Sequence, residues 1–115
     1  MTPYRRQKIS IRLENLSPEI VSDLKQYFPA KKIKAHKGKT EKNMDSFVVV
    51  LHLDKSFDCD KFERFITKNK IKKGKYMLWI SLVTEQYSDG CLVPKHILRV
   101  LCRLGCDLNF SLTKV

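Results

Sequence analysis

Apolar side chains in this chain recur at two spacings, and the order in which those spacings alternate constrains the fold most strongly. Residues 8–13 alternate strictly, which predicts a half-buried strand with Ile9, Ile11 and Leu13 on one face. By the same reasoning, strands are predicted at 32–36, 47–53, 76–84 and 106–113. Helical spacing follows Ser17, follows Asp58, and fills the interval from Pro94 to Gly105.

The predicted order of elements is β-α-β-β-α-β followed by α-β, within 115 residues. A chain of this length with 43 % hydrophobic residues has room for one compact core, so we expect a single α+β domain over residues 1–115. The first six elements follow the split βαβ, ferredoxin-like motif, with one helix and one strand appended. We expect the helices mainly on one face of the sheet, with the other face partly open.

Local signals mark the ends of the three helices. Ser17 suits the N-cap of the first helix and Pro18 its first turn, and Asp58 suits the N-cap of the second. Gly105 suits the C-terminal cap of the third. The buried stripe of that third helix is predicted at Ile97, Leu98, Leu101 and Leu104.

The second face of the predicted sheet also carries apolar side chains, which need a cover. We expect the third helix to supply it, and a second chain or a binding partner are the alternatives. The residues predicted on this face are Val48, Val50, His52, Met77, Trp79 and Val83.

A formal net charge of +11 predicts attraction to a polyanion or to an acidic protein surface. Lysines gather in residues 31–42 and 68–75, which hold the turn signals Gly38 and Gly74, so both runs are expected as surface loops. A merely solvated loop is the alternative reading. A basic stripe on the third helix adds to the set. The candidate partner-binding residues are Lys31, Lys32, Lys34, Lys37, Lys39, Lys72, Lys73, Trp79, Tyr87, Lys95, Arg99 and Arg103.

No reactive centre is predicted from the residue pattern. The three histidines lie apart, the four glycines are isolated, and no known nucleophile, phosphate-loop or zinc-protease motif occurs. Cys102 and Cys106 form a C-x3-C pair with Cys91 upstream, for which structural thiols are the preferred reading and zinc the alternative. We therefore expect a non-enzymatic protein with no catalytic residue, no cofactor and no metal.

The start of the chain lacks the apolar stretch of a secretory signal, and no apolar run reaches the ~18 residues that cross a bilayer. The sequence predicts a cytoplasmic protein with no membrane partner.

Several segments resemble a family of small, mostly uncharacterised bacterial α/β proteins that includes immunity proteins of polymorphic toxin and contact-dependent growth inhibition systems. The likeness spans most of the chain. Its amino-terminal part is Asn15 to Ile20, Pro29 and Lys37-Gly38. Its carboxy-terminal part is Trp79 to Leu82, Gly90, Leu92, Pro94, Ile97-Leu98, Leu101, Leu104-Gly105 and Leu108 to Leu112.

The resemblance implies a cytoplasmic immunity protein that neutralises a cognate toxin by stoichiometric protein–protein contact, as a monomer or a homodimer. Because the chain is so basic, the toxin is expected to present an acidic face. A basic nucleic-acid-binding module is the alternative function, since an open ferredoxin-like sheet can stack bases on aromatic side chains. An inhibitor of a host protein encoded by a phage is a third reading.

Overall fold

The computed structural model describes residues 5–38, 46–84 and 93–114. Its strands are β1 (Arg5–Leu16), β2 (Ile33–Lys37), β3 (Phe47–His52), β4 (Tyr76–Thr84) and β5 (Asp107–Lys114). Its α-helices are α1 (Pro18–Tyr27), α2 (Cys59–Lys68) and α3 (Lys95–Leu104). Two single 3-10 turns, η1 (Ala30–Lys32) and η3 (Lys73–Lys75), precede β2 and β4.

All five strands form one sheet in the order β2-β3-β1-β4-β5. The neighbours β2–β3, β3–β1 and β1–β4 are antiparallel, whereas β5 runs parallel to β4. The prediction of an α+β fold with helices mainly on one face is confirmed as a five-stranded mixed sheet with three helices. The whole sheet differs from a four-stranded antiparallel ferredoxin-like sheet, because β5 extends it at the β4 edge.

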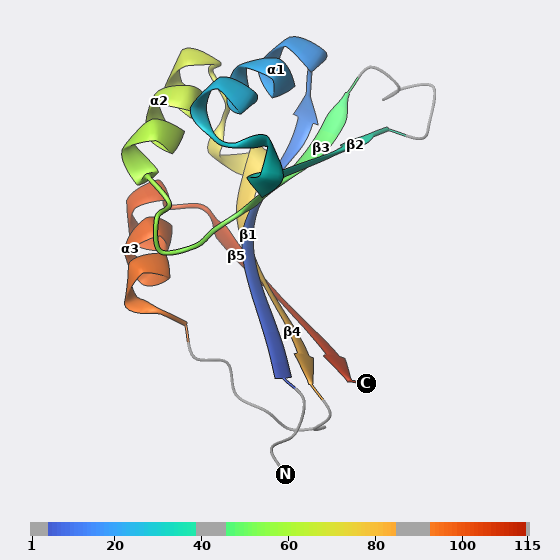
Figure 1. Cartoon of the computed structure of the whole chain (residues 1–115). Coiled ribbons are helices and arrows are strands. Elements are labelled where there is room, and N and C mark those ends of the chain that lie inside the picture. Colours follow the sequence, from blue (N-terminus) through green and yellow to red (C-terminus); the bar gives the residue numbers. More distant parts are fainter. Residues whose placement is uncertain (1–4, 39–45, 85–92, 115) are drawn as a thin grey trace.

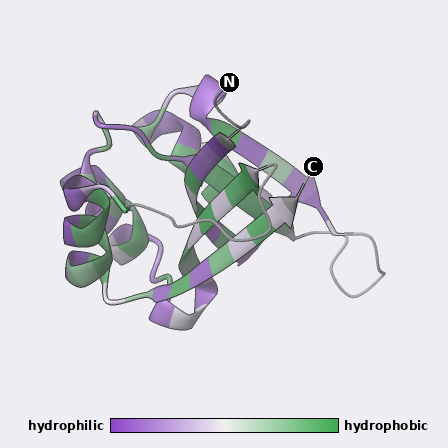
Figure 2. Cartoon of the chain, turned by 90° about the horizontal axis from the view of Figure 1, so that it is seen from below, coloured by the Kyte–Doolittle hydropathy of each residue, from purple (hydrophilic) through white to green (hydrophobic). Residues whose placement is uncertain are grey.

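All three helices lie on the same side of the sheet (Figure 1). Their buried side chains form one core cluster with the strand residues that face them. Along β4, buried and half-buried residues alternate from Tyr76 to Thr84, as expected for a central strand with one covered face. The same alternation of apolar and hydrophilic residues is visible along the strands in Figure 2.

A β-bulge near the end of β1 lets two leucines of that strand face the core. The pairing register with β3 shifts between Leu13 and Leu16, and Asn15 has a φ of 54°, a left-handed conformation that asparagine tolerates well. Leu13 and Leu16 have odd spacing, which would place them on opposite faces of a regular strand. Because of the bulge both are buried, at 0 % and 2 % exposure.

The predicted helix ends are confirmed. The Ser17 hydroxyl accepts a hydrogen bond from the Ile20 amide at 3.3 Å, and the Asp58 carboxylate accepts one from the Lys61 amide at 3.2 Å. Gly105 caps α3 with a φ of 61°, where a side chain would be strained. The buried stripe of α3 differs from the prediction, because Val100 is buried and Leu98 is 46 % exposed.

Two further expectations are wrong. First, α3 does not cover the second face of the sheet: Ile97, Val100 and Leu104 pack into the same core as α1 and α2. Second, residues 31–37 are not a surface loop: Lys31 and Lys32 lie in η1, and the strand predicted at 32–36 is confirmed as β2. Pairing with β3 defines that strand, and its own exposed residues give almost no apolar signal.

Candidate partner-binding surface

The face of the sheet that points away from the helices is the candidate functional surface, and we call it the open face. Strand pairing identifies its members, because directly paired residues share a face. From one edge of the sheet to the other they are Lys34 and His36 of β2; Val48, Val50 and His52 of β3; Arg6, Lys8, Ser10 and Arg12 of β1; Met77, Trp79, Ser81 and Val83 of β4; and Asp107, Asn109, Ser111 and Thr113 of β5.

Burial separates the two sides of the sheet clearly. On the helix side of β1, Ile11 and Leu13 are fully buried. Every member of the open face is exposed or half-buried except Ser10, which is 9 % exposed. Apolar side chains on this face therefore contact solvent, and they flank the polar side chains of the central strand β1.

Trp79 anchors the middle of the open face. The guanidinium carbon of Arg12 lies 4.5 Å from the centre of the Trp79 ring, a cation–π contact between neighbouring strands. Ser10 pairs with Trp79 on one side and with His52 on the other, so these three side chains form a row across the sheet. The small Ser10 side chain leaves the larger indole and imidazole groups prominent.

The charge of the open face is not balanced from within. Its cations are Arg6, Lys8, Arg12 and Lys34, and none of the four forms an ion pair with a carboxylate in the described residues. By strand pairing, Asp107 is the single described carboxylate on this face. The face can therefore accept negative charge from a partner.

Carboxylates of the helix layer and its loops, in contrast, are largely used in internal ion pairs. Asp23 accepts a hydrogen bond from Lys68 at 2.9 Å, and Asp60 and Glu63 both pair with Arg103. The amide of Asn69 also donates to Asp23, at 2.9 Å, and together with Lys68 it lowers the pKa of that carboxyl. These pairs neutralise only part of the positive charge of the helix layer, whereas the four cations of the open face have no ion pair within the described residues.

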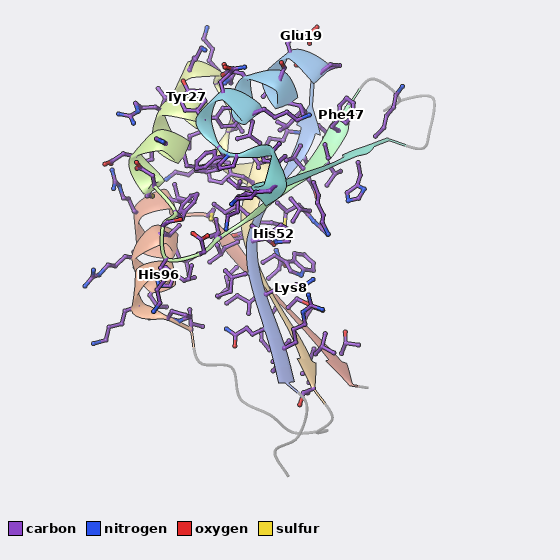
Figure 3. All side chains as sticks on the ribbon, viewed as in Figure 1. Lys8, Glu19, Tyr27, Phe47, His52 and His96 are labelled. Atoms are coloured by element: carbon purple, nitrogen blue, oxygen red, sulfur yellow. The ribbon has the colours of Figure 1, made fainter. Side chains whose placement is uncertain are left out.

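His52 shares the open face with several ammonium groups. Its pKa is lowered, first because the ring is partly desolvated and then because Lys34, Lys8 and Lys32 repel the imidazolium. Figure 3 shows His52 and Lys8 on the sheet, well separated from His96 on α3. The neutral imidazole therefore predominates at neutral pH.

We expect acidification to weaken folding through His52. A lowered pKa means that the unfolded chain binds more protons, so the stabilising contribution is complete above the unfolded pKa of about 6.5 and is lost as the pH falls through the folded value. An NMR titration of the ring should give a midpoint below about 6.5, and Lys34→Ala should raise it. A midpoint above about 6.5 would contradict the repulsion.

The structure disperses the residues singled out in the sequence. Trp79 and Lys34 lie on the open face, whereas Lys95, Arg99 and Arg103 are exposed on α3, on the opposite side of the sheet. The other described lysines lie near the ends of elements: Lys31 and Lys32 in η1, Lys37 at the end of β2, Lys72 just before η3, and Lys73 beside Gly105. Lys39 and Tyr87 are outside the described residues.

The cations of β1 were not among the candidate residues predicted from the sequence. Arg6, Lys8 and Arg12 alternate with the buried residues of that strand, so the strand pattern already assigned Lys8 and Arg12 to the face opposite Ile9 and Ile11. Their importance depends on β1 being the central strand, between β3 and β4. The sequence pattern does not show which strand lies at the centre of the sheet, so the role of these cations could not be predicted from it.

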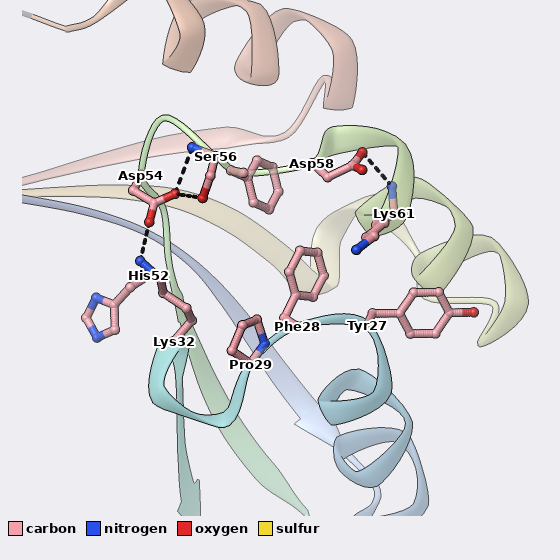
Figure 4. A pocket seen from close by; sticks show the side chains of 10 residues that line it. Tyr27, Phe28, Pro29, Lys32, His52, Asp54, Ser56, Asp58 and Lys61 are labelled. Carbon is pink, nitrogen blue, oxygen red and sulfur yellow. Dashed lines mark hydrogen bonds and ion pairs between the residues drawn. The ribbon is translucent and has the colours of Figure 1, made fainter.

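A pocket of about 220 Å³ lies between the end of α1 and the start of α2 (Figure 4). Its two carboxylates are engaged: Asp54 accepts from Lys32 and from the Ser56 amide at 2.9 Å, and Asp58 caps α2. Lys32 and Ser56 together hold the pKa of Asp54 far below its usual range. The pocket is smaller than typical ligand sites and its carboxylates already accept hydrogen bonds, so we assign it a structural role.

The described cysteines carry free thiols. Cys59 and Cys106 are half-buried, and burial raises the pKa of both, which favours the thiol over the metal-binding thiolate. Within residues 5–38, 46–84 and 93–114, histidines, cysteines and carboxylates do not gather into a group of three that could hold a metal ion. Cys91 lies outside the described residues.

Among the described helices, none combines the length and apolar character needed to span a membrane. No protein-family model matches the chain, and neither a curated protein nor a solved structure matches it. A function can therefore be inferred only from the open face and from the resemblance seen in the sequence.

Proposed function

We propose that this chain is an immunity protein that neutralises a bacterial toxin by binding an acidic surface of that toxin with its open face. The observation that carries the proposal is the Arg12–Trp79 pair, which lies on a sheet face that none of the described helices covers, among cations that form no ion pair with a described carboxylate. Tryptophan and arginine are the residues that most often dominate the energy of protein–protein interfaces. The family resemblance supplies the toxin as the kind of partner.

A protein partner fits the open face better than a nucleic acid does. Val48, Val50, Met77 and Val83 lie on the strands that flank β1, and all four are half-buried apolar residues. Such side chains gain free energy when a protein surface excludes water from them. Binding of single-stranded nucleic acid relies on several stacking aromatics, whereas Trp79 is the single Trp, Tyr or Phe among the described residues of this face, and its ring is already in contact with Arg12.

Nucleic-acid binding remains the second candidate, because four cations on an uncovered sheet form a plausible phosphate-binding surface. The two candidates predict different responses. A nucleic-acid module would bind unrelated single strands with a steep dependence on salt. An immunity protein would bind one toxin in a fixed ratio.

We also propose that the elements β1-α1-β2-β3-α2-β4 form a ferredoxin-like unit. The antiparallel order β2-β3-β1-β4 supports this assignment. The protein acts in the bacterial cytoplasm, where its thiols stay reduced. It performs no catalysis, so inhibition depends on occupancy of the toxin alone.

The direct test is co-purification with the product of the gene immediately upstream, which we expect to carry the toxin domain. We expect a complex of fixed stoichiometry in size-exclusion chromatography and loss of toxin activity at equimolar inhibitor. The control is a gel-shift assay with unrelated single-stranded DNA and RNA, where weak binding that disappears at moderate salt is expected. Failure to form a complex with the toxin, together with tight nucleic-acid binding, would reverse the order of the two candidates.

A further inference from the structure

The two edges of the sheet are protected very differently. At one edge, β2 presents Lys34, His36 and Lys37, all exposed. Lysines on an edge strand are a common device against unwanted strand pairing. At the other edge, β5 has eight residues, and Asp107 is its single charged residue before Lys114.

The apolar face of β5 is also uncovered. Leu108, Phe110 and Leu112 are 45 %, 50 % and 44 % exposed, although they pair with the buried residues of β4 and lie on the helix side of the sheet. The helices therefore cover β4 but leave space above β5. A long edge strand with exposed large apolar side chains is a template for pairing with another strand.

We propose that β5 is a dimerisation strand, which pairs with β5 of a second copy of this chain in antiparallel orientation around a twofold axis. In the register that places Phe110 opposite its own copy, Leu108 lies opposite Leu112 of the second copy, so the three apolar side chains of each chain meet on one face. The same register places Asp107 opposite Thr113 of the second copy, on the other face.

The charge of β5 and the area that it could bury both favour a second copy of this chain as its pairing partner. A chain with a net charge of +11 repels its own copies almost everywhere, and β5 is the strand whose first seven residues contain no cation. The three side chains offer on the order of 300 Å² of apolar surface per chain. The two chains together would bury twice this apolar area, and the paired backbones of the two strands would add to it. The total buried surface then approaches the ~1,200 Å² at which specific interfaces begin.

The dimer would have a continuous ten-stranded sheet, with the helices of both copies on one side and both open faces on the other. Dimerisation would therefore leave the open face accessible. It does not depend on the identity of the partner proposed above.

The test is the mass in solution, measured by sedimentation velocity or by light scattering over a concentration series. We expect the unmodified protein to approach twice the 13.5 kDa chain mass as the concentration rises. Phe110→Lys places two like charges opposite each other at the twofold axis and should raise the dimer dissociation constant at least about tenfold. Leu112→Lys should act in the same direction.

Thr113→Lys is the matched control, because it adds the same charge to the same strand but opposite Asp107 of the second copy. This variant should remain a dimer. A monomer at every accessible concentration, or a dimer that persists in both Phe110→Lys and Leu112→Lys, would overturn the proposal. Circular dichroism of each variant verifies the fold, which is expected to survive since both residues are half exposed.

Discussion

Phe62→Ala is expected to lower the free energy of unfolding by about 3–5 kcal/mol, the usual cost of truncating a fully buried phenylalanine. Phe62 is 0 % exposed, at the centre of the core between α2 and the sheet. Its ring contacts Tyr76 edge-on at 5.7 Å between ring centres and packs at 6.0 Å from Phe57. Domains of this size are stable by only about 5–15 kcal/mol, so the variant loses a large share of its stability.

The measurement is urea denaturation followed by circular dichroism, with Leu98→Ala as the control. Leu98 is 46 % exposed on α3, outside the proposed dimerisation strand, so its truncation should lower the free energy of unfolding by less than about 1 kcal/mol. Equal losses in the two variants would mean that the aromatic cluster around Phe62 does not hold α2 to the sheet. The slope against urea should be similar in both variants if the unfolded states are comparable.

Local sequence signals were sufficient to predict most of the elements. A run of strand-forming apolar residues located β4 at its bounds, and capping residues such as Ser17 and Asp58 located the helix starts. β1 was hardest to delimit, because strict alternation covers residues 8–13 alone, whereas pairing with β4 and β3 extends the strand to Arg5–Leu16. The edge strand β2 was predicted at 32–36, and its pairing with β3 determines its observed extent, Ile33–Lys37. Edge strands depend on their neighbours more than on their own composition.

The position of α3 could not be predicted from its own pattern. A helix with one apolar stripe can pack on either face of a sheet, and both faces of β4 carry apolar residues. In the structure α3 joins the core through Ile97, Val100 and Leu104. This packing leaves Leu98 exposed and leaves the face around Trp79 uncovered. The packing of α3 on the helix side of the sheet therefore leaves the open face, the candidate site, exposed.

The candidate site itself combines residues distant in sequence. Trp79 was identified from the sequence, but Arg12 was not, because their contact requires β1 and β4 to be neighbours. In contrast, the basic stripe of α3 was easy to recognise, and the structure shows Arg103 already paired with Asp60 and Glu63. A basic residue recognised in the sequence is available to a binding partner only if its side chain does not already form an ion pair with a carboxylate of the same chain.

The double substitution Lys8→Glu with Arg12→Glu is therefore expected to weaken binding of the toxin at least about 100-fold, or about 3 kcal/mol. Each substitution replaces an unpaired cation of the open face by an anion that an acidic partner repels. Loss of Arg12 also removes the contact that holds the Trp79 ring. The dissociation constant is measured by isothermal titration calorimetry, at two salt concentrations because rim charges are screened.

The matched control is Lys25→Glu with Arg64→Glu, which makes the same change in net charge on exposed positions of α1 and α2. It should weaken binding less than about threefold, since only long-range attraction is lost. Trp79→Ala tests the tryptophan contact separately from the charges. This variant keeps both cations and should still lose about 2 kcal/mol or more of binding free energy. Equal weakening in the two double variants would mean that the partner responds to total charge and has no specific contact with the open face. Such a result would favour a non-specific polyanion over a toxin, because a cognate protein must distinguish the two sides of the sheet.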